Sequence, residues 1–428
     1  MRILITAAGS HGDVAPYTGL GAHLRAAGHE VALAAPECFA TLVGDSGLDF
    51  RPLPADPRSD PGAGPDTGAG TGAGPGTGTR AGRRGTGGRT SLLARAAAFI
   101  DRLGDGLADA AAPGADLLLL STTTAPLGWH LAEALRLPSA GVYLQPVLPT
   151  RAFPPVVGGT RSLGPWGNLL AGALGQRVVD RLHADAARRL RERLGLPARA
   201  QGAQRRRREQ RNWPVLHGFS PSLLPRPADW RPGLDVVGNW WPYAPAGAHL
   251  PGEVEDFLQA GPPAVFIGFG SMAAGDGERL SELAVRALRR AGVRGLLQSG
   301  WAGLAAAGDD LLTVGELPHA HVLPRTAAVV HHCGAGTSAA GLRAGVPAVP
   351  VPVLADQPFW AARLARIGAA TAPVPFAELT VDRLAAGIRR AVTEESLRRK
   401  ARAAARAMAT EDGAARVAEA VERLADGR

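Results

Sequence analysis

The chain has 428 residues, which is too long for one ordinary hydrophobic core, so we expect two domains. Hydrophobic residues make up 46% of it and aromatic residues only 5%, which indicates large cores built from Ala, Val and Leu. The formal net charge of +9 is nearly all arginine, as in chains from GC-rich genomes, and the arginine-rich segments 80–89 and 205–211 carry no interleaved aromatic residues that could stack on bases. We therefore predict no nucleic-acid partner.

Cysteine usage and apolar runs indicate a reducing compartment. Cys38 and Cys333 are the only cysteines, too few for a disulfide framework or a zinc site. The first apolar run soon meets Asp13, which is typical of a strand and not of a signal peptide. No apolar run approaches the roughly 18 residues of a membrane span. We expect a soluble, cytoplasmic protein, a monomer or homodimer, without stable membrane insertion.

The first half of the chain alternates short apolar runs with helical patterns. Strands are predicted over 2–7, 30–34, 117–121 and 139–144, and helices over 16–27, 91–111, 176–194 and between the last two strands. Two segments interrupt this rhythm. Residues 55–89, rich in Gly, Thr and Pro, are predicted to be a disordered insertion, and residues 198–211 a second disordered segment.

The same alternation returns after a stretch rich in proline and tryptophan. That stretch, 220–252, is predicted to be an interdomain linker without regular structure. Beyond it, strands are predicted over 264–267, 295–298, 311–314, 327–331 and 347–351, with helices over 279–290, after 331 and through most of 380–424. Such alternation predicts two doubly wound α/β domains that face each other across a cleft.

The predicted domain boundaries follow from the linker. The N-terminal domain covers 1–219, the C-terminal domain 253–405, and a last helix, 406–428, is expected to pack back on the N-terminal domain. In doubly wound folds ligands bind at the carboxyl ends of the strands, so we look for functional residues in the turns that follow them.

The first strand-to-helix turn, GSHGD (9–13), places two ionisable side chains at such an end, with Pro16 opening the helix. Asp13 near a helix N-terminus is favoured as the anion, which suits a base that takes a proton from an attacking hydroxyl. The alternative is that Asp13 is only a helix N-cap. His11 is a second base, a phosphate contact or a turn residue without function.

The segment 328–358 carries the strongest binding pattern. Its strand, small-residue turn and helix aim unpaired backbone N–H groups and a positive helix end at an anion. Of the two histidines before the turn, we assign His332 to the ligand and His331 to a strand end satisfied by the backbone. Ser271, after an earlier strand, offers another donor to phosphate. The turn itself consists of Gly334, Ala335, Gly336 and Thr337.

The acid–amide pair Asp356 and Gln357 follows the next strand, on the same edge of the sheet. It is either a ligand pair for hydroxyl groups or an ordinary helix start before Pro358. Phosphate capture beside polyol recognition suggests a nucleotide sugar. Cys333 lies in the phosphate-type turn but has no separate acid–base pair, so we expect no nucleophilic role for it.

Four aromatic residues are further candidates for ligand contacts. Trp301 either lies against a nucleobase or packs in the core. Trp129, Tyr143 and Phe153, on the apolar side of the first domain, either line an acceptor pocket or belong to its core.

Several motifs together resemble the family 1 glycosyltransferases, and most closely the bacterial natural-product and sterol-glucosyltransferase branch, whose usual forms are GSRGDVxP and HHGGAGTT…DQ. The resemblance covers most of the chain apart from 55–89 and 198–211. The motifs are GSHGDVAP (9–16), FSPSLLPRPADW (219–230), GFGSM (268–272), HHCGAGTSAAGLRAGVP (331–347) and ADQPFWAARL (355–364).

The resemblance implies a GT-B fold with two Rossmann-like domains, the N-terminal one for the acceptor and the C-terminal one for the donor. It also implies inverting transfer by direct displacement, with no cofactor and no catalytic metal. By motif, Asp13 matches the acidic base, His332 and the 334–337 turn match the diphosphate cradle together with Ser271, and Asp356 and Gln357 match the pair that holds sugar hydroxyls. Leu317 and Pro318 fall where the backbone of the family meets the nucleobase.

The chain departs from the family pattern at three positions. His11 stands in place of the usual arginine of GSRGD, which makes a contact there weaker or pH-dependent. Cys333 stands where many bacterial members have glycine. Glu316 stands where plant members have an aromatic platform for the base.

The resulting prediction is an inverting glycosyltransferase that moves a hexose from a UDP- or dTDP-linked donor to a hydroxyl of a lipophilic small molecule. The alternatives are a nucleotide-sugar epimerase or hydrolase on the same fold, and a catalytically silent partner of another glycosyltransferase. Retention of Asp13 and of the 356–357 pair argues against the silent partner.

Overall fold

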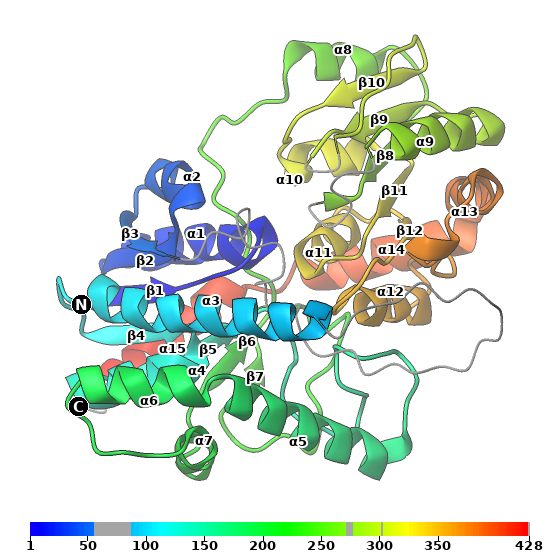
Figure 1. The fold of residues 1–428 in the computed structure, drawn as a ribbon. Coiled ribbons are helices and arrows are strands. Elements are labelled where there is room, and N and C mark those ends of the chain that lie inside the picture. Colours follow the sequence, from blue (N-terminus) through cyan, green and yellow to red (C-terminus); the bar gives the residue numbers. More distant parts are fainter. Residues whose placement is uncertain (55–86, 271–276, 301–302, 427–428) are drawn as a thin grey trace. The chain divides into compact units, whose positions relative to one another are not determined.

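The computed structural model describes residues 1–54, 87–270, 277–300 and 303–426, which form two compact units (Figure 1). The chain passes from one unit to the other after residues 218, 225, 243 and 411. The first unit comprises Met1–Gly218, Arg226–Tyr243 and Asp412–Arg428, and the second Phe219–Pro225 and Ala244–Glu411.

The first unit is built on a seven-stranded sheet of order β3-β2-β1-β4-β5-β6-β7, in which every pairing is parallel. The central strands are apolar on both faces, as expected when helices cover both sides of a parallel sheet. The strands are β1 (Arg2–Thr6), β2 (Glu30–Pro36), β3 (Asp49–Leu53), β4 (Leu117–Leu120), β5 (Ser139–Tyr143), β6 (Val215–His217) and β7 (Leu234–Val236).

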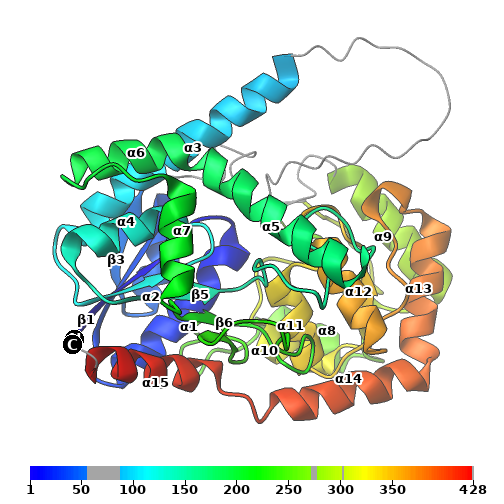
Figure 2. The same ribbon diagram turned by 90° about the horizontal axis from the view of Figure 1, so that it is seen from below.

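Two groups of helices cover this sheet (Figure 2). On one side α1 (His11–Ala26) contacts α2 (Ala40–Asp45), after the short η1 (Glu37–Phe39), and also α15 (Gly413–Asp426). On the other side α3 (Gly87–Ala111) and α4 (Ala125–Leu135) contact one another and α6 (Ala184–Arg193). The remaining helices of this side are α5 (Gly164–Leu182) and α7 (Gln201–Gln210).

The C-terminal helix α15 is part of the first unit. Its Val417, Ala420 and Val421 are buried in the same core as α1 and the central strands. The first residue of α15 is also hydrogen-bonded to the same unit: the indole N–H of Trp240 donates to the carbonyl of Gly413 at 3.1 Å.

The second unit repeats the architecture with a five-stranded parallel sheet of order β10-β9-β8-β11-β12. Alternate residues of the strands face two different cores: Val265 and Ile267 pack with α9 and α13, and Phe266 packs on the opposite side. The strands are β8 (Val265–Gly268), β9 (Gly295–Gln298), β10 (Leu311–Val314), β11 (Ala328–His331) and β12 (Ala348–Pro350).

The helices of the second unit complete both layers. They are α8 (Gly252–Gln259), α9 (Gly277–Ala291), α10 (His319–Val322) followed by η3 (Leu323–Arg325), α11 (Ala335–Arg343), α12 (Gln357–Arg366), η4 (Phe376–Glu378), α13 (Val381–Thr393) and α14 (Glu395–Met408). The predicted fold class, two doubly wound parallel α/β domains, is confirmed.

Two predictions about irregular segments are wrong. Residues 198–211 are not disordered: Gln201–Gln210 form helix α7, in which Arg205 pairs with Asp180 at 3.0 Å and Arg207 with Glu133 at 3.3 Å. The predicted linker 220–252 contains β7, because Leu234–Val236 pair with β6 at the edge of the first sheet. Of the predicted insertion 55–89, residues 55–86 lie outside the described residues, and α3 begins at Gly87.

Two helix predictions also need correction. Helix α1 begins at His11 and not at Pro16, because Ser10 and Asp13 satisfy its first turn, and Pro16 lies inside it. The predicted helix 176–194 is two helices, α5 and α6, that meet at His183.

Candidate active site

Asp13 lies at the topological switch point of the first sheet. The chain leaves β1 for β2 on one side and later returns to β4 on the other, and doubly wound folds bind ligands at the carboxyl ends of two such strands. Asp13 is in the first turn of α1, directly after β1, and its side chain is half-buried.

Three hydrogen bonds hold the Asp13 carboxylate. Its Oδ2 accepts from the backbone N–H and the hydroxyl of Ser10, each at 2.9 Å. Its Oδ1 accepts from Nε2 of Gln145 at 3.3 Å, and the Gln145 Oε1 in turn accepts from the hydroxyl of Thr122 at 3.2 Å. Ser10 and Asp13 follow β1, Thr122 follows β4 and Gln145 follows β5, so the turns after three neighbouring strands form this network.

Burial sets the chemistry of Asp13. Burial raises its pKa, and the hydrogen bonds from Ser10 and Gln145 oppose that rise. The sequence pattern emphasised only the helix end, which favours the anion. A raised pKa makes the carboxylate a stronger base than an exposed aspartate. The N-cap of α1 is Ser10 and not Asp13, whose carboxylate instead accepts the N–H of Ser10 as the third residue of a capping box, and its role as a base stays a prediction.

Gly9 makes room for this arrangement. Its φ is +143°, a conformation that side-chain-bearing residues rarely adopt, and a Cβ there would lie 2.5 Å from Oδ2 of Asp13. His11, by contrast, is exposed, and its ring lies edge-on to Phe39 with the centroids 6.2 Å apart. The structure brings His11 into no hydrogen bond with Asp13 among the residues it describes, so a catalytic role for His11 stays a prediction.

The switch point of the second sheet lies between β8 and β11, and the predicted diphosphate cradle is located there. Helix α11 begins at Ala335 with Gly334 as its N-cap, and no side chain caps it. The first backbone bond into the helix runs from the N–H of Ser338 to the carbonyl of Gly334 at 2.9 Å. The N–H groups of Ala335, Gly336 and Thr337 therefore point out of the helix end, toward the position of an anion.

His332 fills the space between two glycine turns. A Cβ on Gly270 would lie 2.5 Å from its Cε1, and a Cβ on Gly334 would lie 2.7 Å from its Nε2. Burial lowers the pKa of His332 to about 4, so its imidazole is neutral at physiological pH. The ring, which also interacts with the backbone of Gly268, lies beside the N-terminus of α11 without bringing a charge of its own.

The neighbouring His331 has a structural role. Its side chain is fully buried, and its Nδ1 accepts the backbone N–H of Cys333 at 3.1 Å. Burial also lowers its pKa, to about 3. The backbone contact of His331 agrees with the role expected for it, and the ligand role of His332 stays a prediction.

Two non-glycine residues with positive φ flank the cradle. Cys333 has φ +67° and Ala355 has φ +63°, conformations that cost roughly 1 kcal/mol each for residues with a Cβ. Cys333 is fully buried, and burial raises the pKa of its thiol, so it is a thiol and not a nucleophilic thiolate.

The acid–amide pair lies in the turn between β12 and α12. Oδ2 of Asp356 accepts the indole N–H of Trp360 at 2.7 Å, which fixes the carboxylate. Oε1 of Gln357 accepts the backbone N–H groups of Val353 and Leu354 at 2.9 and 3.3 Å. Asp356 is also the N-cap residue of α12, without a side-chain cap bond, so it does begin a helix, as the alternative interpretation proposed. The role of both residues toward sugar hydroxyls stays a prediction.

The other predicted donor contacts are less defined. Leu317 and Pro318 are half-buried between β10 and α10, and Pro318 is the N-cap of α10. Ser271 and Trp301 lie outside the described residues.

The predicted acceptor residues are core residues of the first unit. Trp129, Tyr143 and Phe153 are 7%, 5% and 4% exposed. Trp129 and Tyr143 both pack on Trp213, with ring centroids 5.7 and 6.4 Å apart. This packing gives both a structural function, and their contact with an acceptor stays a prediction.

Three members of the Asp13 network were missed from the sequence: Ser10, Thr122 and Gln145. Each lies within a few residues of a strand's carboxyl end, which was the available signal. No motif marked Thr122 or Gln145, because the partners of a network across parallel strands are far apart in sequence: Asp13 and Gln145 are 132 positions apart.

Among the described residues there is neither a metal-ligand cluster nor a membrane-spanning helix. No group of three or more His, Cys, Asp or Glu side chains there is arranged to hold a metal ion. No helix in those parts of the chain is long and apolar enough to cross a membrane.

Two family models match the chain. The model for the erythromycin biosynthesis protein CIII-like C-terminal domain matches residues 297–424, and the glycosyltransferase family 28 N-terminal domain matches residues 3–73. The O-mycaminosyltylonolide 6-deoxyallosyltransferase of Streptomyces fradiae is 38% identical over all of this chain and 98% of its own length. A sterol 3-beta-glucosyltransferase of Arabidopsis thaliana is 30% identical, and its alignment covers 97% of this chain and 64% of the plant protein.

Solved structures share the fold over nearly the full length. The glycosyltransferase of kitacinnamycin is 20% identical with a TM-score of 0.69, and the alignment covers 99% of this chain and 98% of that one. A Streptomyces sp. SF2575 glycosyltransferase complexed with thymidine diphosphate is 22% identical with a TM-score of 0.63, covering 99% of both chains. The two units therefore have the GT-B arrangement of sheets and helices.

Proposed function

The chain belongs to the family 1 glycosyltransferases of the GT-B fold, in the natural-product and sterol-glycosyltransferase branch, and on that premise we propose that it moves a hexose from a UDP- or dTDP-linked donor to a hydroxyl of a lipophilic small molecule. The names of the macrolide and sterol enzymes support a lipophilic acceptor. The thymidine diphosphate bound by a structural neighbour supports a nucleoside diphosphate donor.

The single observation that carries the proposal is the placement of Asp13. A half-buried carboxylate with a raised pKa, fixed by Ser10 and Gln145, lies at the switch point of the first sheet. Asp13 takes the proton of the acceptor hydroxyl while the acceptor oxygen forms its bond to the anomeric carbon of the sugar. The bond from that carbon to the diphosphate oxygen breaks with its electron pair going to the diphosphate, so the anomeric configuration inverts.

The second unit stabilises the leaving group. The N–H groups of Ala335, Gly336 and Thr337 at the start of α11 and the neutral ring of His332 receive the charge that develops on the diphosphate. Asp356 and Gln357, both fixed by local hydrogen bonds, hold sugar hydroxyls. These groups need no bound metal or other cofactor to act, and we propose that the enzyme uses none.

A thermal-shift screen of UDP-, dTDP- and GDP-sugars tests the donor class. A donor that binds the native state raises the melting temperature by mass action, by about 2.7 kcal/mol of stability at 100 times its Kd. We expect stabilisation by a UDP- or dTDP-sugar that is reduced in Thr337→Val, whose hydroxyl is lost at the cradle. No stabilisation by any of these sugars would contradict the proposal.

Dependence on an acceptor separates the alternatives. Glycosyl transfer requires nucleotide release to rise when a lipophilic alcohol is added. An epimerase or hydrolase releases a changed or free sugar without acceptor, and a silent partner binds donor without any turnover.

A further inference from the structure

A second cluster of charge lies in the first unit, away from Asp13. The end of α4 and the end of α7 border a cavity of about 250 Å³. Asp13 follows the carboxyl end of β1, whereas α4 ends just before the first residue of β5, so the cavity is at the opposite edge of the same sheet. Its lining consists of Ala132, Glu133, Arg136, Leu137, Gln204, Arg207, Arg208 and Arg211.

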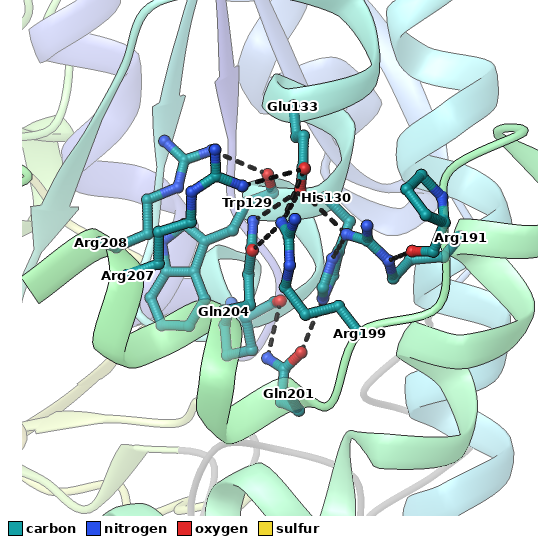
Figure 3. Close-up of polar contacts among 11 residues, drawn as sticks. Trp129, His130, Glu133, Arg191, Arg199, Gln201, Gln204, Arg207 and Arg208 are labelled. Carbon is teal, nitrogen blue, oxygen red and sulfur yellow. Dashed lines mark hydrogen bonds and ion pairs between the residues drawn. The ribbon is translucent and has the colours of Figure 1, made fainter.

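The only acid of this lining is already neutralised. Glu133 accepts hydrogen bonds from Arg199 at 2.7 and 2.8 Å and from Arg191 at 2.9 Å, although neither arginine lines the cavity (Figure 3). Gln204 and Arg207 add further bonds to the same carboxylate, at 3.0 and 3.3 Å. Figure 3 shows these side chains converging on Glu133 from α6, α7 and the segment between them.

The remaining arginines lack comparable partners. Arg208 donates only to neutral oxygens, the carbonyl of Trp129 at 2.9 Å and the hydroxyl of Ser139 at 3.4 Å. Arg136 and Arg211 are exposed and form no ion pair with any residue that the structure describes. Burial, with smaller contributions from the neighbouring Arg207 and Arg211, lowers the pKa of Arg208 to about 10. The cations of this cavity therefore repel one another.

The net charge of the lining indicates which kind of anion the cavity can bind. Four lining arginines face one glutamate. The C-terminal ends of α4 and α7 contribute about −0.5 each, which explains part of the arginine content as helix stabilisation. Even with Glu133 counted against the lining arginines alone, a surplus of at least about +2 remains, because Arg191 and Arg199 share the same carboxylate. A carboxylate would neutralise half of that surplus, whereas a phosphate group carries about −1.5 to −2 at neutral pH and matches it. Guanidinium groups also fit phosphate oxygens in a bidentate manner.

We propose that this cavity is a binding site for the phosphate group of a small soluble anion, separate from the donor cradle. The volume, at about 250 Å³, lies just under the range of ordinary small-ligand pockets, which suits one or two phosphate groups and not a whole nucleotide sugar. Arg136 and Arg211, the C-cap residues of the two helices, bind the anion directly. Arg207 and Arg208 add positive charge to the same lining.

Calorimetric titration of inorganic phosphate at low ionic strength tests the site. The double variant Arg136→Gln/Arg211→Gln removes two exposed cations of the lining. Arg188→Gln/Arg206→Gln removes the same charge from exposed positions of α6 and α7 outside the lining, and it is the matched control. We expect the cavity double variant to bind phosphate at least about tenfold more weakly than wild type, since one lost charge-assisted hydrogen bond is worth about a factor of ten. The control should bind like wild type.

Two further measurements distinguish this site from the donor cradle and phosphate from other anions. Thr337→Val should retain the phosphate binding that the cavity variant loses, so failure of the donor proposal and failure of this one are distinguishable. Acetate, a monoanionic carboxylate, should bind more weakly than phosphate. Wild-type affinity in the cavity double variant, equal loss in both double variants, or acetate binding as tight as phosphate would each overturn the proposal.

Discussion

Replacing Glu133 by glutamine should destabilise the first unit far more than the loss of an ordinary surface charge. The side chain of Glu133 is 21% exposed and that of its partner Arg191 only 1%. The substitution leaves the Arg191 guanidinium buried, with His130 as a neutral neighbour at 2.9 Å and no carboxylate. Removing one partner of a buried pair costs about 3–5 kcal/mol.

The pKa of Glu133 gives a second estimate of the free energy of unfolding that the substitution removes, and it is of the same size. Burial alone would raise this pKa, but the hydrogen bonds and charges of Arg191 and Arg199 lower it from 4.5 to about 2. A depressed carboxyl pKa contributes stability that is fully present above pH 4.5 and is lost as the pH falls toward 2. A shift of this size corresponds to about 3 kcal/mol. Wild type should lose this contribution in that window, and Glu133→Gln should lack it at every pH.

Urea unfolding followed by tryptophan fluorescence measures the effect, since Trp129 and Trp213 pack together beside this cluster. Asp185→Asn is the matched control, because it also removes an acid paired with an arginine, but the two side chains are 76% and 60% exposed. We expect the control to change the free energy of unfolding by less than about 1 kcal/mol. Equal unfolding midpoints for Glu133→Gln and the control would refute the reasoning.

Three other substitutions have specific expected outcomes. Gly9→Ala should displace the Asp13 carboxylate and lower kcat about 100-fold, because the added Cβ would lie 2.5 Å from Oδ2. Gly12→Ala is the control and should transfer sugar normally, because the nearest atom to its added Cβ is 3.9 Å away. Gly334→Ala should displace His332 and weaken the binding of a nucleoside diphosphate, measured by titration, about tenfold. Gly341→Ala is its control, because its added Cβ would meet no atom within 4 Å, and equal affinities of the two variants would contradict the predicted cradle. Cys333→Ala should leave transfer activity unchanged. In the native wild type, iodoacetamide should modify the half-buried Cys38 before the buried Cys333, as followed by peptide mass spectrometry. The reverse order would contradict a raised pKa of the Cys333 thiol.

Several strands were predictable because they are short runs of mostly apolar residues. β9 and β10 have the bounds that the sequence indicated, 295–298 and 311–314. Helix α7 was not predictable in this way, since its sequence QGAQRRRREQ has almost no apolar residue. It is held by hydrogen bonds and ion pairs to Glu133 and Asp180, residues that lie far away in sequence.

The site was predictable where one turn holds the groups together. Asp13, His332 and the 334–337 turn follow single strands, so their spacing alone indicated them as candidates. Gln145 and Thr122 meet Asp13 only because β1, β4 and β5 are neighbours in the sheet, and strand order is not written in local spacing. The packing of Trp129 and Tyr143 on Trp213 likewise depends on tertiary contacts that no local pattern indicates.

Asp13→Asn tests the central proposal most directly, because asparagine keeps an oxygen that can accept the N–H of Ser10 and loses only the basic carboxylate. Donor binding by calorimetry and sugar transfer to a lipophilic alcohol are measured on the same preparation. The account predicts unchanged donor affinity and a loss of transfer of about 100-fold to 10,000-fold, the contribution of a general base. Transfer near the wild-type rate by a variant that binds donor normally would contradict it.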